Sequence, residues 1–310
     1  MSRWVTRSSR RAVTTSGSSS GVAGFRAAER GESRPENPWH SAADRRYRAG
    51  MTDVEPAPEP HDPSSPSPVW DAEMARSYDT PGEGMFAPEQ VDPAVARLAE
   101  LAGNGAALEF AVGTGRIAVP LVARGVPVTG VELSGAMVDR LRGRADEATI
   151  PVVIGDMATT RVPGDFTLVY LVYNTISNLL TQAEQVRCFR NAASHLGPGG
   201  RFVVELGVPS LRRLPPGQDG LVFAHGDGYV GLDTFDLEHQ HLVSHHIRFE
   251  KGGEPSVIRV KQRYVWPSEL DLMAQMAGFE LESRHADWKG APFTGDSGSH
   301  VSVYRLPEQD

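Results

Sequence analysis

The sequence predicts an α/β protein with a doubly wound, mainly parallel sheet. Three observations carry this prediction. Short apolar runs alternate with segments whose apolar residues recur at helical spacing, over about a hundred residues. Two glycines, Gly113 and Gly115, separate the first apolar run from the helix after it, and such a turn lets a ligand approach the backbone. Acidic residues end three successive runs, at Glu109, Glu132 and Asp156, so we expect them at one edge of the sheet.

Helices and strands are expected to alternate through this region. Helices are expected after Gly115, after Ser134 and after Thr181. Ser134 is a typical N-cap, and Thr181 with Glu184 has the spacing of a capping box. The glycine-rich segment 197–200 ends the last of these helices. The five parallel strands are expected at residues 107–110, 126–131, 150–154, 166–172 and 201–205.

Further elements are expected on either side of this unit. Before it, the sequence predicts a short amphipathic helix at residues 70–79 and a longer helix that starts at Asp92 or Pro93. After the fifth strand, an antiparallel β insertion is expected at about residues 207–266, and it ends in a hairpin. The insertion strands are predicted at residues 221–223, 229–232, 242–249 and 257–266. A helix from Pro267 to Gly278 and strands at residues 280–284 and 300–306 complete the chain.

The acidic residues suggest a nucleoside ligand. Glu132 follows Gly113 by 19 residues, which is near the spacing at which a carboxylate binds the ribose of a nucleotide in a βαβ unit. Asp156 supplies a hydrogen-bond acceptor for an adenine edge, and Met157 supplies an apolar side chain for its face. The segment 113–118 also fits the dinucleotide fingerprint G-x-G-x-x-G/A. An NAD(P)-dependent oxidoreductase is therefore one alternative.

From Leu108 to Glu205, the order of these motifs resembles that of class I S-adenosylmethionine-dependent methyltransferases of the small-molecule type. The resemblance implies a Rossmann-like seven-stranded sheet with an antiparallel last strand, and S-adenosyl-L-methionine as cofactor. It implies that residues 109–115 form the glycine motif, that Glu132 binds the ribose and that residues 155–157 bind adenine. The cofactor-binding residues implied in this way are Glu109, Ala111, Gly113, Gly115, Glu132, Leu133, Met137, Asp156, Met157 and Leu171.

The charge of Glu109 distinguishes the two cofactors. Its carboxylate would repel a pyrophosphate at this turn, whereas it would attract the ammonium and sulfonium groups of S-adenosylmethionine. We therefore expect methyl transfer to an N, O or C nucleophile of a small metabolite. Ala111 stands where the family pattern usually has glycine, and we expect it to keep a negative φ. This departure is the support for another alternative, a protein of this fold that binds the cofactor without transferring its methyl group.

The acceptor is expected where the loops after the parallel strands converge. Tyr173, Asn174 and Asn178 follow the fourth strand, and Tyr78 lies in a segment that we expect to form a lid. The amide of Asn174 and the hydroxyl of Tyr78 are candidate catalytic groups, with stabilisation of the turn as the alternative role for Asn174 and packing on the edge of the core as that for Tyr78. Tyr173 and Asn178 are candidate substrate contacts, with stabilisation of the loop as the alternative role for Asn178.

The predicted hairpin offers two further candidates. His245 and Tyr264 are polar residues on otherwise apolar faces, and Gln262 is a third. We consider His245 a candidate catalytic residue and Tyr264 a candidate substrate contact, with a histidine that only packs in the core as the alternative. Neighbouring histidines around position 245 alternate between faces and lack acidic or cysteine partners at metal-ligand spacing. We therefore expect no metal site.

Composition limits the class of partner. The 310 residues are 40% hydrophobic and contain no apolar stretch of membrane-spanning length. Residues 1–50 hold ten Arg and four acidic residues, whereas the remainder holds 21 Lys and Arg against 35 acidic residues, which argues against nucleic acid as a partner. We expect a cytoplasmic bacterial protein, monomeric or homodimeric and not bound to a membrane, that acts on a small-molecule acceptor. Residues 1–68 are expected to form a disordered extension with a Pro-rich linker, and residues 69–310 the methyltransferase domain.

Overall fold

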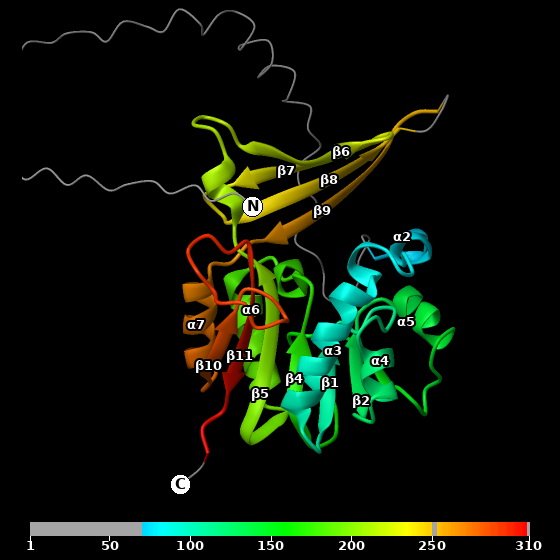
Figure 1. Ribbon diagram of the computed structural model, residues 1–310, viewed down its shortest axis with the longest axis vertical. Helices are drawn as coiled ribbons and strands as arrows, with labels where there is room; N and C mark the ends of the chain where they lie inside the picture. The colour runs from blue at the N-terminus through cyan, green and yellow to red at the C-terminus, as the bar shows by residue number, and fades with distance from the viewer. Residues whose placement is uncertain (1–69, 250–252, 309–310) are drawn as a thin grey trace, which may run out of the picture. The chain divides into compact units, whose positions relative to one another are not determined.

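The structure is a computed structural model that describes residues 70–249 and 253–308 (Figure 1). Its central sheet has seven strands in the order β10-β11-β5-β4-β1-β2-β3. Strands β1 to β5 are parallel, and β11 runs antiparallel to both β5 and β10. The predicted doubly wound sheet with an antiparallel last strand is therefore confirmed. The extension predicted for residues 1–68 lies outside the described part of the chain.

The elements follow the predicted order. The strands of the central sheet are β1 (Ala106–Phe110), β2 (Val128–Glu132), β3 (Val152–Ile154), β4 (Phe166–Leu171), β5 (Leu196–Gly207), β10 (Glu280–His285) and β11 (Ser299–Arg305). The helices are α2 (Ala72–Tyr78), η1 (Gly84–Phe86), α3 (Pro88–Ala102), α4 (Ala118–Ala123), α5 (Gly135–Arg142), η2 (Thr175–Asn178), α6 (Gln182–Ala193), η3 (Ser210–Arg213) and α7 (Pro267–Met276). None of the helices in the two described ranges is long and apolar enough to span a membrane.

Helices cover both faces of the sheet, because successive residues of each strand point to opposite faces. On one face, α3, α4 and α5 contribute Leu98, Leu121 and Leu141 to a buried apolar cluster. On the other face, α6 and α7 contribute Phe189 and Leu270 to a second cluster. Burying each of these large side chains stabilises the fold by about 1.5–3 kcal/mol. Packing against the sheet, more than intrinsic helix propensity, therefore holds these short helices.

Two helix starts that the sequence predicted are confirmed by their caps. Ser134 Oγ accepts a hydrogen bond from the backbone N–H of Met137 at the start of α5. At the start of α6, both halves of the capping box between Thr181 and Glu184 are formed. These caps satisfy backbone N–H groups that have no partner within the helix.

Helix α3 begins earlier than predicted. It starts at Pro88 and contains Pro93, whereas the sequence predicted a start at Asp92 or Pro93. Pro88 is favourable at the start, where its N–H would have no helical partner and its fixed φ suits the helix. Pro93 cannot donate a hydrogen bond inside the helix, but Val95 and Leu98 on the same helix are buried. Their burial explains why the helix continues through this proline.

The predicted β insertion is a separate antiparallel sheet of β6 (Gly220–Gly226), β7 (Tyr229–Asp236), β8 (His241–Arg248) and β9 (Ser256–Arg263), in that order. The strand register of this sheet shows how the three polar residues of the predicted hairpin are oriented. His245 lies opposite Arg259, whereas Gln262 lies opposite Leu242, so His245 and Gln262 point to opposite faces. Tyr264 lies beyond the end of β9. The hairpin therefore does not present His245, Gln262 and Tyr264 together.

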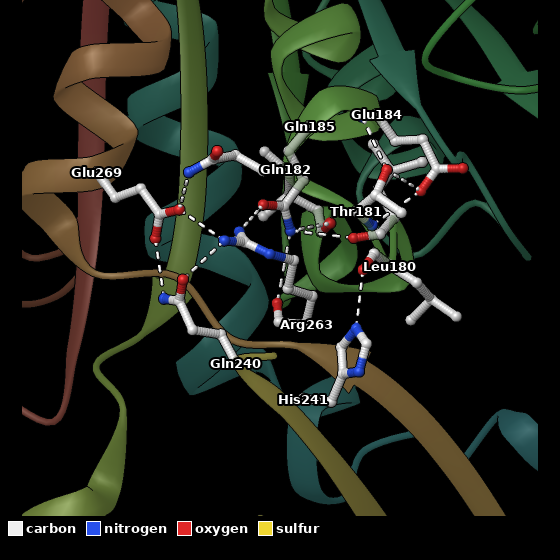
Figure 2. A network of polar contacts seen from close by, with 11 residues as sticks. Leu180, Thr181, Gln182, Glu184, Gln185, Gln240, His241, Arg263 and Glu269 are labelled. Carbon is white, nitrogen blue, oxygen red and sulfur yellow. Dashed lines mark hydrogen bonds and ion pairs between the residues drawn. The ribbon is translucent and has the colours of Figure 1, made fainter. Parts of the chain in front are cut away.

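A buried polar network joins this second sheet to the helices of the first (Figure 2). Arg263, at the end of β9, donates hydrogen bonds to Gln185 of α6, to Gln240 at 2.8 Å and to Glu269 of α7 at 2.6 Å. Gln240 also donates to Glu269, at 3.1 Å. Burial raises the pKa of Glu269, but the hydrogen bonds from Arg263 and its neighbours outweigh this and hold it below its usual range. A charged pair therefore fixes one end of the β insertion against α6 and α7.

Candidate functional site

The carboxylate of Glu132 lies at the centre of the predicted cofactor site. Its Oε2 accepts a hydrogen bond from the N–H of Gly113 and its Oε1 one from the N–H of Ser134, each at 2.8 Å. Glu132 is 6% exposed, and burial raises its pKa although these N–H groups oppose the rise. Each carboxylate oxygen has a second lone pair, so the group can still accept the two hydroxyls of a ribose. The arrangement fits the nucleoside that the spacing predicted.

The glycine turn has left-handed backbone at three positions, and one of them is not glycine. Ala111 has φ +54°, Gly113 +57° and Gly115 +81°. The prediction that Ala111 keeps a negative φ is therefore wrong, because the turn retains the conformation that glycine would adopt. A Cβ on Gly115 would lie 2.3 Å from Leu141, whereas one on Gly113 would meet only a backbone oxygen at 3.9 Å. Gly115 is thus needed for packing, and Gly113 leaves room for a ligand to approach.

The side chain of Glu109 is buried, although its position at a strand end predicted that it faces a ligand. It is 3% exposed, and Oε2 accepts a hydrogen bond from the hydroxyl of Tyr170 at 2.8 Å. Burial raises the pKa of Glu109 to about 8, against the lowering effects of Tyr170 and Arg116. The side chain is mainly protonated at neutral pH. A cation bound beside Glu109 would favour its ionised form. The attraction of Glu109 for the ammonium or sulfonium of the cofactor stays a prediction.

The predicted adenine residues follow β3. Asp156 Oδ1 accepts a hydrogen bond from the N–H of Ala158 at 2.8 Å, which leaves Oδ2 for a ligand. Met157 and Met137 are almost covered, at 8% and 3% exposure. Leu133, which follows Glu132, is half-buried. These positions are compatible with an apolar adenine pocket.

Leu171 differs from the other predicted cofactor residues. Its side chain is fully buried in the apolar cluster beneath α6 and α7. It therefore faces the core, and only its backbone could contribute to binding. The reason is that side chains alternate between the two faces along β4, and Leu171 points to the face covered by α6 and α7.

The segment before α3 is attached to both turns of the cofactor site. The carbonyl oxygen of Trp70 accepts a hydrogen bond from the hydroxyl of Ser134 at 2.5 Å. Asp79 Oδ1 accepts one from the hydroxyl of Thr114 at 2.6 Å, and its Oδ2 lies 2.7 Å from the guanidinium of Arg144. Sequence reasoning did not single out Thr114 or Arg144, because their partner is distant in the chain. Residues 70–79 thus lie against both turns, as a lid would.

Tyr78 lies in an aromatic group within this segment. Its ring makes edge contacts with Trp70 at 5.7 Å and with Phe86 at 5.9 Å between centroids. Burial raises the pKa of Tyr78 to about 12, although the charge of Arg116 lowers it. The guanidinium of Arg116 lies 5.3 Å from the ring centroid of Tyr173. Tyr78 therefore keeps its proton at neutral pH and can donate a hydrogen bond, but it cannot act as a general base.

The turn after β4 is strained and is held by β5. Tyr173 and Asn174 have φ +57° and +59°, a conformation that is unfavourable for tyrosine and that asparagine tolerates better. Glu205 holds both: its Oε2 accepts the N–H of Tyr173 at 2.9 Å, and its backbone oxygen accepts that of Asn174 at 3.2 Å. Asn174 Oδ1 in turn accepts the N–H of Gly207 at 2.6 Å. Such strain is typical of functional turns, and Glu205 is a fourth acid at a strand end that sequence reasoning missed.

The remaining candidates are less closely tied to this turn. Asn178 is half-buried, and its side chain makes no hydrogen bond to a described residue. His245 Nε2 lies 3.0 Å from the hydroxyl of Thr234, within the β insertion. Tyr264 is 6% exposed and packs its ring edge against Phe235. Neither His245 nor Tyr264 has a hydrogen bond or ring contact with a described residue of the cofactor turns. Across residues 70–249 and 253–308, no three His, Cys, Asp or Glu side chains are grouped so that they could hold a metal ion.

Comparisons with known proteins identify the family of the chain. Residues 107–200 match the family described as "Methyltransferase domain". Cypemycin N-terminal methyltransferase from a Streptomyces species is 26% identical over 251 residues, which are 77% of this chain and 98% of that protein. The structure of the CcbJ methyltransferase from Streptomyces caelestis is 37% identical with a TM-score of 0.69, and the match covers 77% of this chain and 98% of that one. CalS10 bound to S-adenosylmethionine, an amino pentose methyltransferase from Micromonospora echinaspora, shares the fold at 18% identity, with a TM-score of 0.53 over 88% of this chain and 99% of that one.

Sequence identity shows the family of the chain, and the geometry of the predicted site is consistent with it. The match to CcbJ extends over almost the whole of that methyltransferase. The buried carboxylate of Glu132 and the open side of Gly113 fit the nucleoside and the amino-acid part of the cofactor. The chain belongs to the class I S-adenosylmethionine-dependent methyltransferases.

Proposed function

We propose that the protein transfers the methyl group of S-adenosylmethionine to a nitrogen atom of a small, amine-bearing molecule. The observation that carries the proposal is the junction formed by Glu132, which joins the turn after β1 to the turn after β2 beneath residues 70–79. The choice of nitrogen is supported by the relative at 26% identity, whose name gives it an N-terminal acceptor. Oxygen and carbon acceptors are the other outcomes that an activity test distinguishes.

The chain's own residues bind and align the reactants. Glu132 accepts the ribose hydroxyls, and Asp156 with Met157 borders the adenine. The bound cofactor supplies a methyl group that the positive sulfur has already activated. The protein therefore contributes mainly proximity, alignment and exclusion of water, which need no strong base or acid.

Water exclusion falls to the segment before α3. Trp70, Tyr78 and Phe86 form an aromatic group next to the cofactor turns, and Asp79 holds the segment to Thr114. The protonated hydroxyl of Tyr78 donates a hydrogen bond to the cofactor or to the acceptor. Tyr173 and Asn174 place the acceptor at the end of β4, because loops after parallel strands converge on the same edge as the cofactor.

The alternatives have less support. An NAD(P)-dependent oxidoreductase is disfavoured because the relatives are named methyltransferases. The alternative of a protein that binds the cofactor without transferring its methyl group was based on Ala111, which stands where the family pattern usually has glycine. Since Ala111 adopts the left-handed conformation expected of glycine, this substitution gives no reason to expect a loss of cofactor binding.

Turnover of S-adenosylmethionine with matched acceptors tests the proposal. The protein is incubated with the cofactor and with pairs of small molecules that differ only in an amine or a hydroxyl, and S-adenosylhomocysteine is quantified. We expect product with amines and an N-methyl group by mass spectrometry. Methylation of oxygen or carbon instead, or tight cofactor binding without turnover on any acceptor, would overturn the proposal.

Two variants test the assignment of the acceptor site. Tyr78→Phe removes the hydroxyl but keeps the ring, and Asn174→Asp keeps an oxygen that can accept the N–H of Gly207. We expect both to lower kcat far more than they weaken S-adenosylhomocysteine binding by calorimetry. His245→Gln is expected to have a smaller effect, because His245 bonds within the β insertion. Unchanged kinetics in the first two variants would place the acceptor elsewhere.

A further inference from the structure

A cavity of about 200 Å³ lies between the start of α3, the end of β5 and the connection from β10 to β11. Its charged lining residues are three carboxylates and one ammonium group, from Glu89, Glu205, Asp287 and Lys289. The carboxylates do not form a group that could hold a metal ion among the described residues. The excess of negative charge in this partly open cavity favours an organic cation.

Two further lining residues indicate a ligand site. Trp288 is half-buried and packs on the apolar cluster beneath α3, so it forms an apolar wall. His300 also lines the cavity and is fully buried. Its Nε2 has no hydrogen-bond partner among the described residues, although its Nδ1 lies 2.9 Å from the hydroxyl of Ser302. Most buried polar atoms in folded proteins have a hydrogen-bond partner, so this nitrogen is available to a ligand.

The charge of His300 does not cancel the negative charge of the cavity. Burial, with a smaller effect from the positive charge of Arg284, lowers the pKa of His300 to about 4. The imidazole is therefore neutral at pH 7. An aromatic wall, a neutral polar nitrogen and excess carboxylate are the features that bind an alkylammonium group.

Glu205 connects this cavity to the proposed acceptor turn. Its Oε2 accepts the N–H of Tyr173, and its Oε1 makes no hydrogen bond to a described residue. One oxygen thus holds the strained turn while the other is available to a ligand. The cavity therefore shares a residue with the turn that we placed beside the methyl acceptor.

We infer that this cavity binds the acceptor through a protonated aliphatic amine, with the Glu205 carboxylate on the ammonium and Trp288 against the adjoining hydrocarbon. The inference deepens the proposed function and rests on its amine acceptor. The ammonium gives one proton to the Glu205 carboxylate, and the lone pair that is freed forms the new N–C bond as the S–C bond of the cofactor breaks. It assigns Glu205 to substrate binding and makes cationic small molecules the substrate class. Neutral analogues of the same shape lack the attraction to Glu205 and bind more weakly, and anionic analogues are repelled by the charge of the site.

Binding of three molecules of similar shape tests the inference. The probes are cyclohexylammonium, cyclohexanol and cyclohexanecarboxylate, measured by saturation-transfer NMR with the full chain saturated with S-adenosylhomocysteine. We expect cyclohexylammonium to bind about tenfold more tightly than cyclohexanol, and the carboxylate not to bind. Equal binding of the amine and the alcohol, or no binding of the amine, would overturn the inference.

Variants locate the binding. Glu205→Gln keeps an oxygen for the N–H of Tyr173 but removes the charge, and we expect it to weaken cyclohexylammonium binding about tenfold while cyclohexanol binding is unchanged. Glu89→Lys, at an exposed position in the first turn of α3, should weaken the amine similarly. Glu100→Gln, at an exposed position later in the same helix, is the matched control. Amine binding that is unchanged in both cavity variants would show that the ammonium binds elsewhere.

Different experimental results would contradict the cavity assignment and the proposed function. If amines bind in a charge-dependent manner but no amine is methylated, the proposed function is wrong and the cavity assignment stands. If amines are methylated with the same KM by Glu205→Gln and by the wild type, the cavity assignment is wrong and the proposed function stands. Thermal unfolding and S-adenosylhomocysteine binding of each variant identify any loss that comes from misfolding.

Discussion

Glu132 accepts a hydrogen bond from the backbone N–H of Gly113 at 2.8 Å, across 19 residues of sequence. The side chain that binds the ribose in our proposal therefore also fixes the turn that receives the rest of the cofactor. Since its other oxygen accepts the N–H of Ser134, the two turns are held by one carboxylate. Any change at Glu132 is expected to affect both turns.

We expect Glu132→Ala to weaken S-adenosylhomocysteine binding by roughly ten- to a hundredfold, because charge-assisted hydrogen bonds are lost. Glu132→Gln should also weaken it, since its amide nitrogen must face one of the two N–H donors. Asp156→Ala is expected to act more mildly. Calorimetry measures these affinities, with Glu100→Gln as the surface control. Wild-type affinity in a folded Glu132→Ala protein would refute the ribose assignment.

Glu109 predicts a specific pH dependence of stability. Burial raises its pKa to about 8 from the usual 4.5. Between these values the folded state keeps a proton that the unfolded state has released. The stabilisation is therefore complete below pH 4.5 and is lost as the pH rises through 8.

Glu109→Gln mimics the protonated side chain and has no proton to lose. We expect its free energy of unfolding, relative to that of the wild type, to increase with pH by up to about 1.4 kcal/mol per pH unit within this window. Denaturant titrations across the window measure this difference. A difference that does not change with pH would show that Glu109 is ionised in the folded protein.

The left-handed conformation of Ala111 predicts an unusual response to glycine. Glycine adopts this φ without strain, so Ala111→Gly is expected not to lower the free energy of unfolding and to keep cofactor binding. The same substitution at Ala96, exposed in the middle of α3, should lower it by about 1 kcal/mol. Ala111→Val should be strongly destabilising, because a β-branched residue is disfavoured at positive φ. Equal losses at Ala111 and Ala96 would contradict the assigned backbone conformation.

The Arg263 network predicts that the β insertion depends on one buried charge. Arg263→Ala leaves the Glu269 carboxylate without its cationic partner, and we expect a loss of about 3–5 kcal/mol in the free energy of unfolding. Arg259→Ala, on the exposed part of the same strand, should change it by less than about 0.5 kcal/mol. Denaturant unfolding of both variants provides the comparison. Similar small effects in both would show that the network does not hold the insertion in place.

Local sequence determined much of the fold and of the cofactor half of the site. Gly113, Gly115 and Glu132 could be proposed as nucleoside-binding residues because a strand, a tight turn and a helix impose a nearly fixed spacing on such residues. The capping box of Thr181 and Glu184 was recognised for the same reason, since its hydrogen bonds join residues only three apart. The antiparallel last strand followed from the family resemblance, and the sheet order confirmed it.

Tertiary structure decided the features that depend on contacts between distant segments. The φ of Ala111 is set by the shape of the whole turn, and residue type alone suggested the opposite sign. The faces of His245 and Gln262 depend on strand register, where a shift of one residue exchanges the two faces of a strand. Glu205 became a site residue only when β5 placed it against Tyr173, and Asp79 when the chain brought it to Thr114. Sequence records which groups are available, whereas these pairings arise from packing that no local pattern encodes.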